Sequence, residues 1–168
     1  MTKRQDIMRS KYLAGCIKRY STWPMIHSQT VGHHCWRVAC IFVEVFGLPR
    51  AEVLYYCLHH DSGELFAGDL PYGAKSGVPG LKEKMVEAES IGLKNLNIQL
   101  PEITEEERIK IKICDLLEMW ETGMHEQKLG NSYADPIVND TMVAVRQLAM
   151  DSSLTQHLDD WFWSRRNQ

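Results

Sequence analysis

The amino-acid sequence predicts an all-α protein, in which six or seven helices form one compact bundle. Apolar residues recur at helical spacing through most of the chain. Helix-capping residues stand immediately before several of these stretches. Glycine and proline are concentrated in one segment, residues 61–80. A chain of 168 residues is expected to form a single domain, spanning residues 1–168.

The first half of the chain is expected to contain three helices, at residues 6–19, 31–46 and 50–60. Thr30 predicts the start of the second helix, because threonine is a favoured N-cap residue. Gly47 and Pro49 predict its end. Pro49 also suits the first turn of the third helix.

Residues 61–80 are predicted to form a long irregular loop with room for one short helical turn. Seven glycines and prolines lie in it: Gly63, Gly68, Pro71, Gly73, Gly77, Pro79 and Gly80. Loops of this length within compact domains are usually functional.

The second half is expected to contain helices at residues 81–93, 104–125, 136–150 and 154–165. Thr104 and Glu107 have the spacing of a capping box, and Pro136 suits a first helical turn. Asp151 or Ser152 is expected to cap the last helix.

The composition is that of an ordinary globular protein, with 44% hydrophobic residues, 24% charged residues and a net charge of −3. This charge argues against a nucleic-acid polymer as partner. The five cysteines are odd in number and show no CxxC spacing, so reduced thiols in a cytoplasmic protein are expected. No stretch has the length or hydropathy of a signal peptide or membrane span.

Asp115 lies on a predicted helix whose apolar residues surround nearly the whole circumference. That helix is therefore expected to be central and buried. A buried carboxylate is costly unless a cation or hydrogen-bond donors compensate it. Taken alone, a structural aspartate bonded to backbone amides or to an arginine is the more common interpretation.

The triplet His59-His60-Asp61 ends an apolar helix and begins the glycine-rich loop. Imidazole and carboxylate groups are common ligands of transition metals. Adjacent helical residues point about 100° apart, so a shared ion requires the helix to unwind, and Gly63 is expected to allow this. Glu64 follows His60 by four positions and can return to the same place. A polar helix end is the alternative interpretation.

His33-His34 begins another predicted helix, beside the apolar residues Val31 and Val38. One histidine of the pair is expected to face a site and the other solvent. Three separate segments thus each offer a metal-ligand type. Their combination leaves coordination positions free for water and substrate, unlike a closed structural site.

The order His34, His60-Asp61, Asp115 resembles the HD superfamily of metal-dependent phosphohydrolases, over about residues 19–134. Within it, the chain is most similar to bacterial 5′-deoxynucleotidases and small phage deoxynucleotide phosphohydrolases, including those that destroy dATP. The similar segments are Arg19-Tyr20, Thr30-Val31-Gly32-His33-His34-Cys35, His60-Asp61-Ser62-Gly63-Glu64, Gly68-Asp69-Leu70-Pro71 and Lys112-Ile113-Cys114-Asp115. The resemblance implies an HD-type helical bundle.

The resemblance also implies a role for each matching residue. The metal ligands would be His34, His60, Asp61 and Asp115, holding a divalent transition metal such as Zn, Co or Mn. The catalytic residues would be Glu64, which orients or deprotonates water, and Asp69, near the sugar and phosphate. Arg19, Lys75 and Lys112 would bind phosphate. The loop residues Tyr20, Thr22 and Trp23 are the expected contacts of base and sugar. Tyr20 stands where the family commonly has tryptophan, and His33 where the bacterial enzymes often have glutamate.

The expected function is metal-dependent hydrolysis of phosphate from 2′-deoxynucleotides. A phage dATP triphosphohydrolase, acting also on dADP and dAMP and giving deoxyadenosine, is preferred; if phage-encoded, it would act in the host cytoplasm. The runner-up is a 5′-deoxynucleotidase acting on dNMPs without strong base preference. A non-catalytic nucleotide- or metal-binding regulator comes next, and a cyclic-nucleotide phosphodiesterase is the last candidate. The similarity further implies a homo-oligomer, a dimer or larger.

Overall fold

The computed structural model describes the backbone of residues 3–70 and 77–166, and within these residues the predicted all-α class is confirmed. The helices are α1 (Lys3–Gly15), α2 (Val31–Phe46), α3 (Ala51–His59), α4 (Glu64–Ala67), α6 (Leu81–Asn95), α7 (Glu105–Lys128), the 3₁₀ helix η1 (Ser132–Ala134), α8 (Asp135–Asp151) and α9 (Thr155–Arg166). The predicted loop 61–80 does contain a helical turn, α4.

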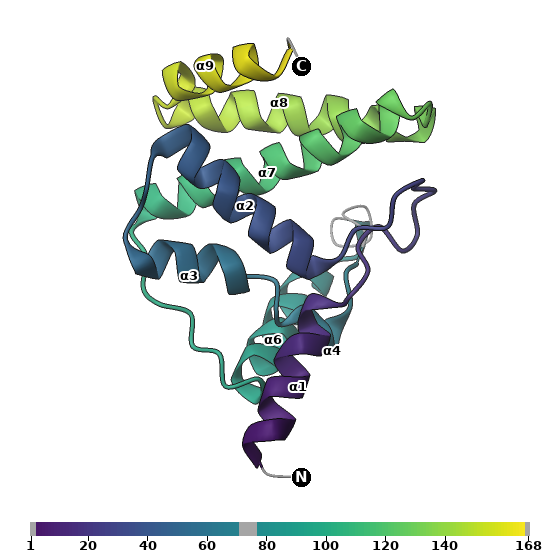
Figure 1. Ribbon diagram of the computed structural model, residues 1–168, viewed down its shortest axis with the longest axis vertical. Helices are drawn as coiled ribbons and strands as arrows, with labels where there is room; N and C mark the ends of the chain where they lie inside the picture. Colours follow the sequence, from purple (N-terminus) through teal and green to yellow (C-terminus); the bar gives the residue numbers. More distant parts are fainter. Residues whose placement is uncertain (1–2, 71–76, 167–168) are drawn as a thin grey trace.

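The centre of the molecule is the contact between α2 and α7. In Figure 1, α2 crosses α7, with α8 and α9 on one side and α1, α4 and α6 toward the opposite end. Val38 and Ile41 of α2 and Ile113 and Leu117 of α7 are completely buried in the main core. As predicted, α7 is a central helix, so polar side chains on its inner face are removed from water.

Local signals place the beginnings of both central helices correctly. The hydroxyl of Thr30 accepts a hydrogen bond from the backbone amide of His33, so the first turn of α2 is capped. Thr104 and Glu107 form the predicted reciprocal capping box at the start of α7. These caps determine where along the chain the helices begin, and therefore which residues occupy their first turns.

The first helix ends earlier than predicted. It stops at Gly15 rather than at residue 19. Beyond it, the chain turns and Lys18 pairs with Thr30 in an isolated antiparallel bridge. The backbone amide of Arg19 donates to the carbonyl of Gln29 as part of this pairing. Long-range hydrogen bonds thus replace the last helical turn that the apolar spacing favoured.

The predicted cap of the last helix is also wrong. Asp151 is the final residue of α8, and Ser152 is the C-terminal cap of that helix. The Ser152 hydroxyl donates to the carbonyl of Leu148, which also accepts a hydrogen bond from the Ser152 backbone amide. Both residues therefore end α8 and do not begin α9.

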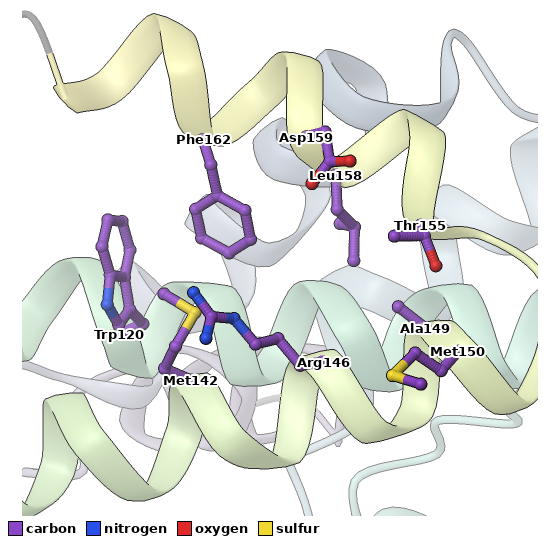
Figure 2. A pocket seen from close by; sticks show the side chains of 9 residues that line it. All are labelled: Trp120, Met142, Arg146, Ala149, Met150, Thr155, Leu158, Asp159 and Phe162. Carbon is purple, nitrogen blue, oxygen red and sulfur yellow. The ribbon is translucent and has the colours of Figure 1, made fainter.

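A cavity of about 490 Å³ lies between α7, α8 and α9. Figure 2 shows the nine side chains that line it, which include Trp120, Met142, Arg146 and Phe162. None of the nine is among the site residues predicted above. All five cysteines are free thiols, of which Cys16 is exposed. No described helix combines the length and the apolar character needed to cross a membrane.

Candidate metal centre

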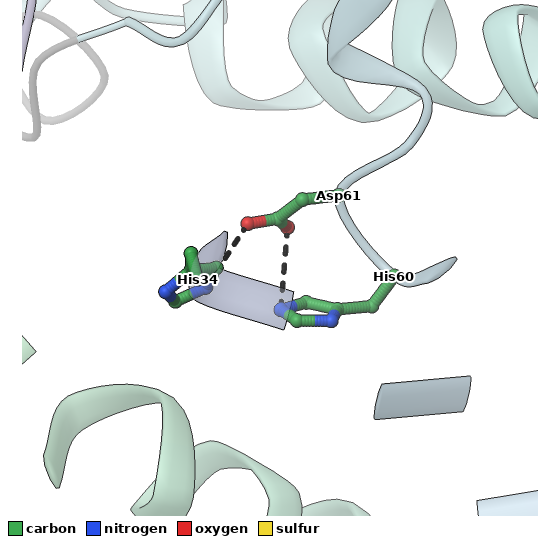
Figure 3. Close-up of side chains that lie close together, drawn as sticks. All are labelled: His34, His60 and Asp61. Carbon is green, nitrogen blue, oxygen red and sulfur yellow. Dashed lines mark ion pairs between the residues drawn. The ribbon is translucent and has the colours of Figure 1, made fainter. Parts of the chain in front are cut away.

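Three elements bring the four predicted metal ligands to one place. His34 lies in the first turn of α2, His60 and Asp61 directly follow α3, and Asp115 lies in the middle of α7. Figure 3 shows the side chains of His34, His60 and Asp61 turned toward one another. One possible ligand atom from each of these three residues lies within 4.8 Å of the others.

The separations between donor atoms suit a single metal ion. His34 Nε2 lies 3.3 Å from Asp61 Oδ2 and 3.2 Å from Asp115 Oδ1. His60 Nε2 lies 3.5 Å from Asp61 Oδ1. Two ligand atoms held about 2.1 Å from one tetrahedral ion lie roughly 3.4 Å apart. The three separations between these pairs of atoms are of that size, as expected for donors that share an ion.

Each histidine is held through Nδ1, which leaves Nε2 available. His60 Nδ1 lies 2.8 Å from the carbonyl oxygen of Cys57, and His34 Nδ1 lies 2.6 Å from Glu118 Oε2. Both partners only accept hydrogen bonds, so Nδ1 carries the proton in the neutral ring. Both Nε2 atoms are buried and make no hydrogen bond within the described part of the chain. Two buried lone pairs facing carboxylates fit a transition-metal ion.

His34, His60, Asp61 and Asp115 are called the donor cluster below. The electrostatics of the donor cluster also favour a cation. Burial and Arg19 would lower the pKa of His34, but Asp115, Asp61 and Glu118 hold it well above its usual value. Burial would raise the pKa of Asp61, but His60 and His34 hold it below the usual range. The same field that attracts a proton to the imidazole attracts a metal ion.

The two predicted catalytic carboxylates lie in different surroundings. Glu64 begins α4, one turn after His60, and only 5% of it is exposed. Asp69 is half-buried after α4, and its Oδ2 accepts a hydrogen bond of 3.0 Å from the Tyr20 amide. This hydrogen bond connects the loop after α4 with the loop after α1.

Gly63 contributes to this arrangement differently from the prediction. It was expected to unwind the chain after His60, yet its backbone is ordinary right-handed helix. Its small size is needed instead, because a Cβ there would collide with the carbonyl oxygen of Glu89 on α6. Close packing against α6 therefore sets the position of α4 and of Glu64.

Two of the three predicted phosphate-binding residues lie beside the donor cluster. The Arg19 side chain is 9% exposed, and its Nη1 lies 3.6 Å from Glu118 Oε2. Lys112 donates to Asp115 Oδ2 across 2.6 Å, while 57% of its side chain remains exposed. Lys75 lies outside the described residues. Positive charge thus borders the cluster from α7 and from the segment after α1.

The predicted base and sugar contacts divide into two groups. Tyr20 contacts two predicted site residues: its amide donates to Asp69, and the Arg19 guanidinium lies 5.5 Å from its ring centre; its φ is +56°. Thr22 and Trp23 are exposed, and the Trp23 indole donates to the carbonyl of Tyr133. Within the described residues, neither of the latter two hydrogen-bonds to a predicted metal ligand.

Three residues that sequence reasoning missed complete the site. Glu118 is 1% exposed and bonds to His34; Gln29 and Thr122 bond to Glu118 in turn. The available signal was the spacing of Asp115 and Glu118, three residues apart on one face of an apolar helix. Gln29 and Thr122 have no comparable sequence signal.

No protein-family model and no curated protein sequence matches this chain. Solved structures do match. An HD-domain phosphohydrolase from Listeria innocua has a TM-score of 0.77 at 18% identity, covering 98% of this chain and 90% of its own. The cyanophage S-2L HD phosphohydrolase DatZ, solved with dA and one catalytic Zn²⁺ ion, has a TM-score of 0.75 at 19% identity, covering 100% and 99%.

A third match, a conserved hypothetical protein from Pyrococcus furiosus, has a TM-score of 0.68 at 19% identity, covering 97% of this chain and 99% of its own. At such identities the likeness establishes the fold. The predicted HD-type helical fold is therefore confirmed.

Proposed function

We propose, from the HD-domain fold and the donor cluster together, that this chain is a metal-dependent phosphohydrolase of 2′-deoxynucleotides. One observation carries the proposal. His34 and His60 are both held through Nδ1. The buried Nε2 of His34 faces Asp61 and Asp115, and that of His60 faces Asp61, at separations suited to one ion. Such a set leaves coordination positions for water and substrate.

A divalent ion bound by these four residues would supply Lewis-acid chemistry, lowering the pKa of water and polarising a phosphoryl oxygen. Zn²⁺ is the leading candidate because the cyanophage neighbour was solved with a catalytic Zn²⁺; Co²⁺ and Mn²⁺ also suit mixed His and carboxylate ligands. The proposed role of Glu64 is to orient the attacking water and accept its proton. Its burial one turn after His60 supports that role.

The charged residues around the cluster would bind the phosphates. Arg19 and Lys112 offer positive charge on two sides, and Lys75 is proposed as a third cation. Phosphoryl transfer depends mainly on positioning and on neutralising oxygen charge, so these residues would bind the phosphates of the substrate and keep those contacts in the transition state. Asp69 would orient the sugar or protonate the leaving oxygen.

The preferred substrate is dATP, followed by dADP and dAMP, with deoxyadenosine as the nucleoside product. The cyanophage neighbour was solved with dA, which supports a deoxyadenosine substrate here. Arg19 and Lys112, with Lys75 as the proposed third cation, would suit more than one phosphate. Tyr20, Thr22 and Trp23, in the segment after α1, are the proposed contacts of base and sugar.

A panel of dNMPs and dNTPs, each assayed with Zn²⁺, Co²⁺ and Mn²⁺, tests this assignment through nucleoside and phosphate release. We expect dATP to be hydrolysed fastest. Equal turnover of all dNMPs without attack on dATP would instead identify a 5′-deoxynucleotidase. No turnover of any nucleotide by the metal-loaded protein would favour a non-catalytic binding protein. The molar mass of the purified protein, measured by light scattering after size-exclusion chromatography, tests the proposed homo-oligomer.

A further inference from the structure

We propose that Glu118 is a positioning residue, whose single buried carboxylate orients both the metal ligand His34 and the phosphate-binding Arg19. This inference rests on the proposed function for the roles of those two residues. Glu118 would contact neither the ion nor the substrate. It would act through the side chains that do.

The first step is the geometry at Glu118 Oε2. This oxygen lies 2.6 Å from His34 Nδ1 and 3.6 Å from Arg19 Nη1. An ionised carboxylate only accepts hydrogen bonds, so His34 must donate from Nδ1. The lone pair on Nε2 is then directed at the oxygens of Asp61 and Asp115, where an ion would lie. Carboxylate–histidine pairs of this kind fix the ring orientation of metal ligands.

The second step is the other oxygen, which holds Glu118 itself in place. Oε1 accepts from the Gln29 amide and, across 3.0 Å, from the Thr122 hydroxyl. Gln29 Nε2 also lies 2.9 Å from the Thr122 hydroxyl oxygen. Both Glu118 and Gln29 are buried, at 1% and 6% exposure. A carboxylate satisfied at both oxygens in a dry environment has little freedom to move.

The third step links this network to Arg19 a second time. The carbonyl of Gln29 accepts a hydrogen bond of 3.0 Å from the backbone amide of Arg19. Arg19 is therefore held at its backbone by Gln29 and at its guanidinium by Glu118. A disturbance at Glu118 reaches both His34 and Arg19, although these residues lie on different segments.

The variant Glu118→Gln tests the proposal, because it keeps the shape of the side chain and removes its charge. Zn²⁺ affinity of the folded apoprotein is measured by competition with a chromophoric chelator. Partners of metal-binding histidines typically contribute about 10- to 100-fold to affinity. We expect a loss of that size and, at saturating Zn²⁺, a higher KM for dATP as Arg19 loses its ion pair.

Glu121→Gln is the matched control. Glu121 lies one turn further along α7 and pairs with Arg37, away from the donor cluster. It should change stability without changing Zn²⁺ affinity. Wild-type Zn²⁺ affinity in Glu118→Gln, or an equal loss in both variants, would overturn the positioning of His34. An unchanged KM would overturn the positioning of Arg19.

A spectroscopic measurement on the unmodified protein covers the case in which Glu118→Gln does not fold. Long-range ¹H–¹⁵N spectra of the Zn²⁺-loaded protein should show His34 with its proton on Nδ1. A proton on Nε2 would overturn the proposal. Zn²⁺ affinity and the position of the His34 proton are measured without turnover. If the protein hydrolyses no nucleotide but its Zn²⁺ affinity still depends on Glu118, the proposed function is refuted and the positioning role of Glu118 stands.

Discussion

His34 Nε2 on α2 lies 3.2 Å from Asp115 Oδ1 on α7, and both helices contribute buried residues to the main core. These two metal-ligand candidates thus lie where α2 packs against α7. Substitution of His34 or Asp115 would disturb both packing and chemistry. Informative variants are therefore better placed at the edge of the cluster.

His60→Ala should abolish hydrolysis while the protein stays folded. His60 follows α3, and its ring supplies a buried Nε2 whose loss removes one of four donors. Zn²⁺ affinity should fall by roughly 100-fold or more, beyond the effect of removing an outer partner. Metal content by mass spectrometry, circular dichroism and dATP turnover together check this.

The neighbouring His59→Ala is its control. The His59 ring contacts Tyr55 on α3 and lies outside the donor cluster. Zn²⁺ content and turnover should remain at wild-type level. Full activity in His60→Ala would refute the proposed metal centre.

Lys112→Ala should raise KM for dATP about 10-fold, since losing roughly 1.4 kcal/mol of phosphate binding corresponds to that factor. Lys112 is exposed on one side and held by Asp115 on the other, so its ammonium group borders the cluster. Steady-state kinetics at saturating metal measure the change. Lys110→Ala provides the comparison, because Lys110 pairs with Glu106 and should leave KM unaltered.

Gly92→Ala should destabilise the protein by about 1–3 kcal/mol, the usual cost of overpacking. A Cβ at this position of α6 would lie 2.5 Å from the carbonyl oxygen of Gly63, so α4 must shift and carry Glu64 with it. We expect a lower kcat as well as a lower free energy of unfolding in urea. Gly77→Ala is the control, because a Cβ there meets nothing within 4 Å, and it should change neither kcat nor the free energy of unfolding. A stable and fully active Gly92→Ala would contradict the packing argument.

Glu126→Gln should destabilise the protein at neutral pH, by about 1–3 kcal/mol for lost hydrogen bonds to a buried charge. Glu126 is 1% exposed and accepts from the amides of Ile26 and His27 and from the Asn131 side chain. Burial would raise the pKa of Glu126, but these donors lower it below its usual value.

The sign of the pH dependence follows from that lowered pKa. The folded state binds the Glu126 proton less readily than the unfolded state, so the stabilisation is present above the unfolded pKa. It is lost as the pH falls through the folded pKa. Urea unfolding of wild type and Glu126→Gln from pH 7 to 3 should therefore converge in acid. A difference in free energy of unfolding that stays constant with pH would exclude the Glu126 carboxylate as the source of the pH dependence. Glu83→Gln, at an exposed position, serves as control.

Local signals in the sequence were sufficient for most of the secondary structure. The caps at Thr30 and Thr104 involve residues three apart, so the chain encodes them without reference to the fold. The end of the first helix was predicted four residues too late, because hydrogen bonds between residues 17–19 and 29–31 compete with its last turn. Apolar spacing contains no information about such distant partners.

By itself, the sequence determined the helical class and pointed to four candidate metal ligands, because several segments each offer a metal-ligand side chain and their order resembles that of HD phosphohydrolases. Donor atoms of three of them, His34, His60 and Asp61, lie within 4.8 Å of one another. Tertiary structure alone decided how those atoms are oriented. Glu118 reaches His34 across 84 positions, and only the crossing of α2 and α7 brings the two together. A buried carboxylate hydrogen-bonded at both oxygens depends on distant partners, and its function becomes visible only when the chain has folded.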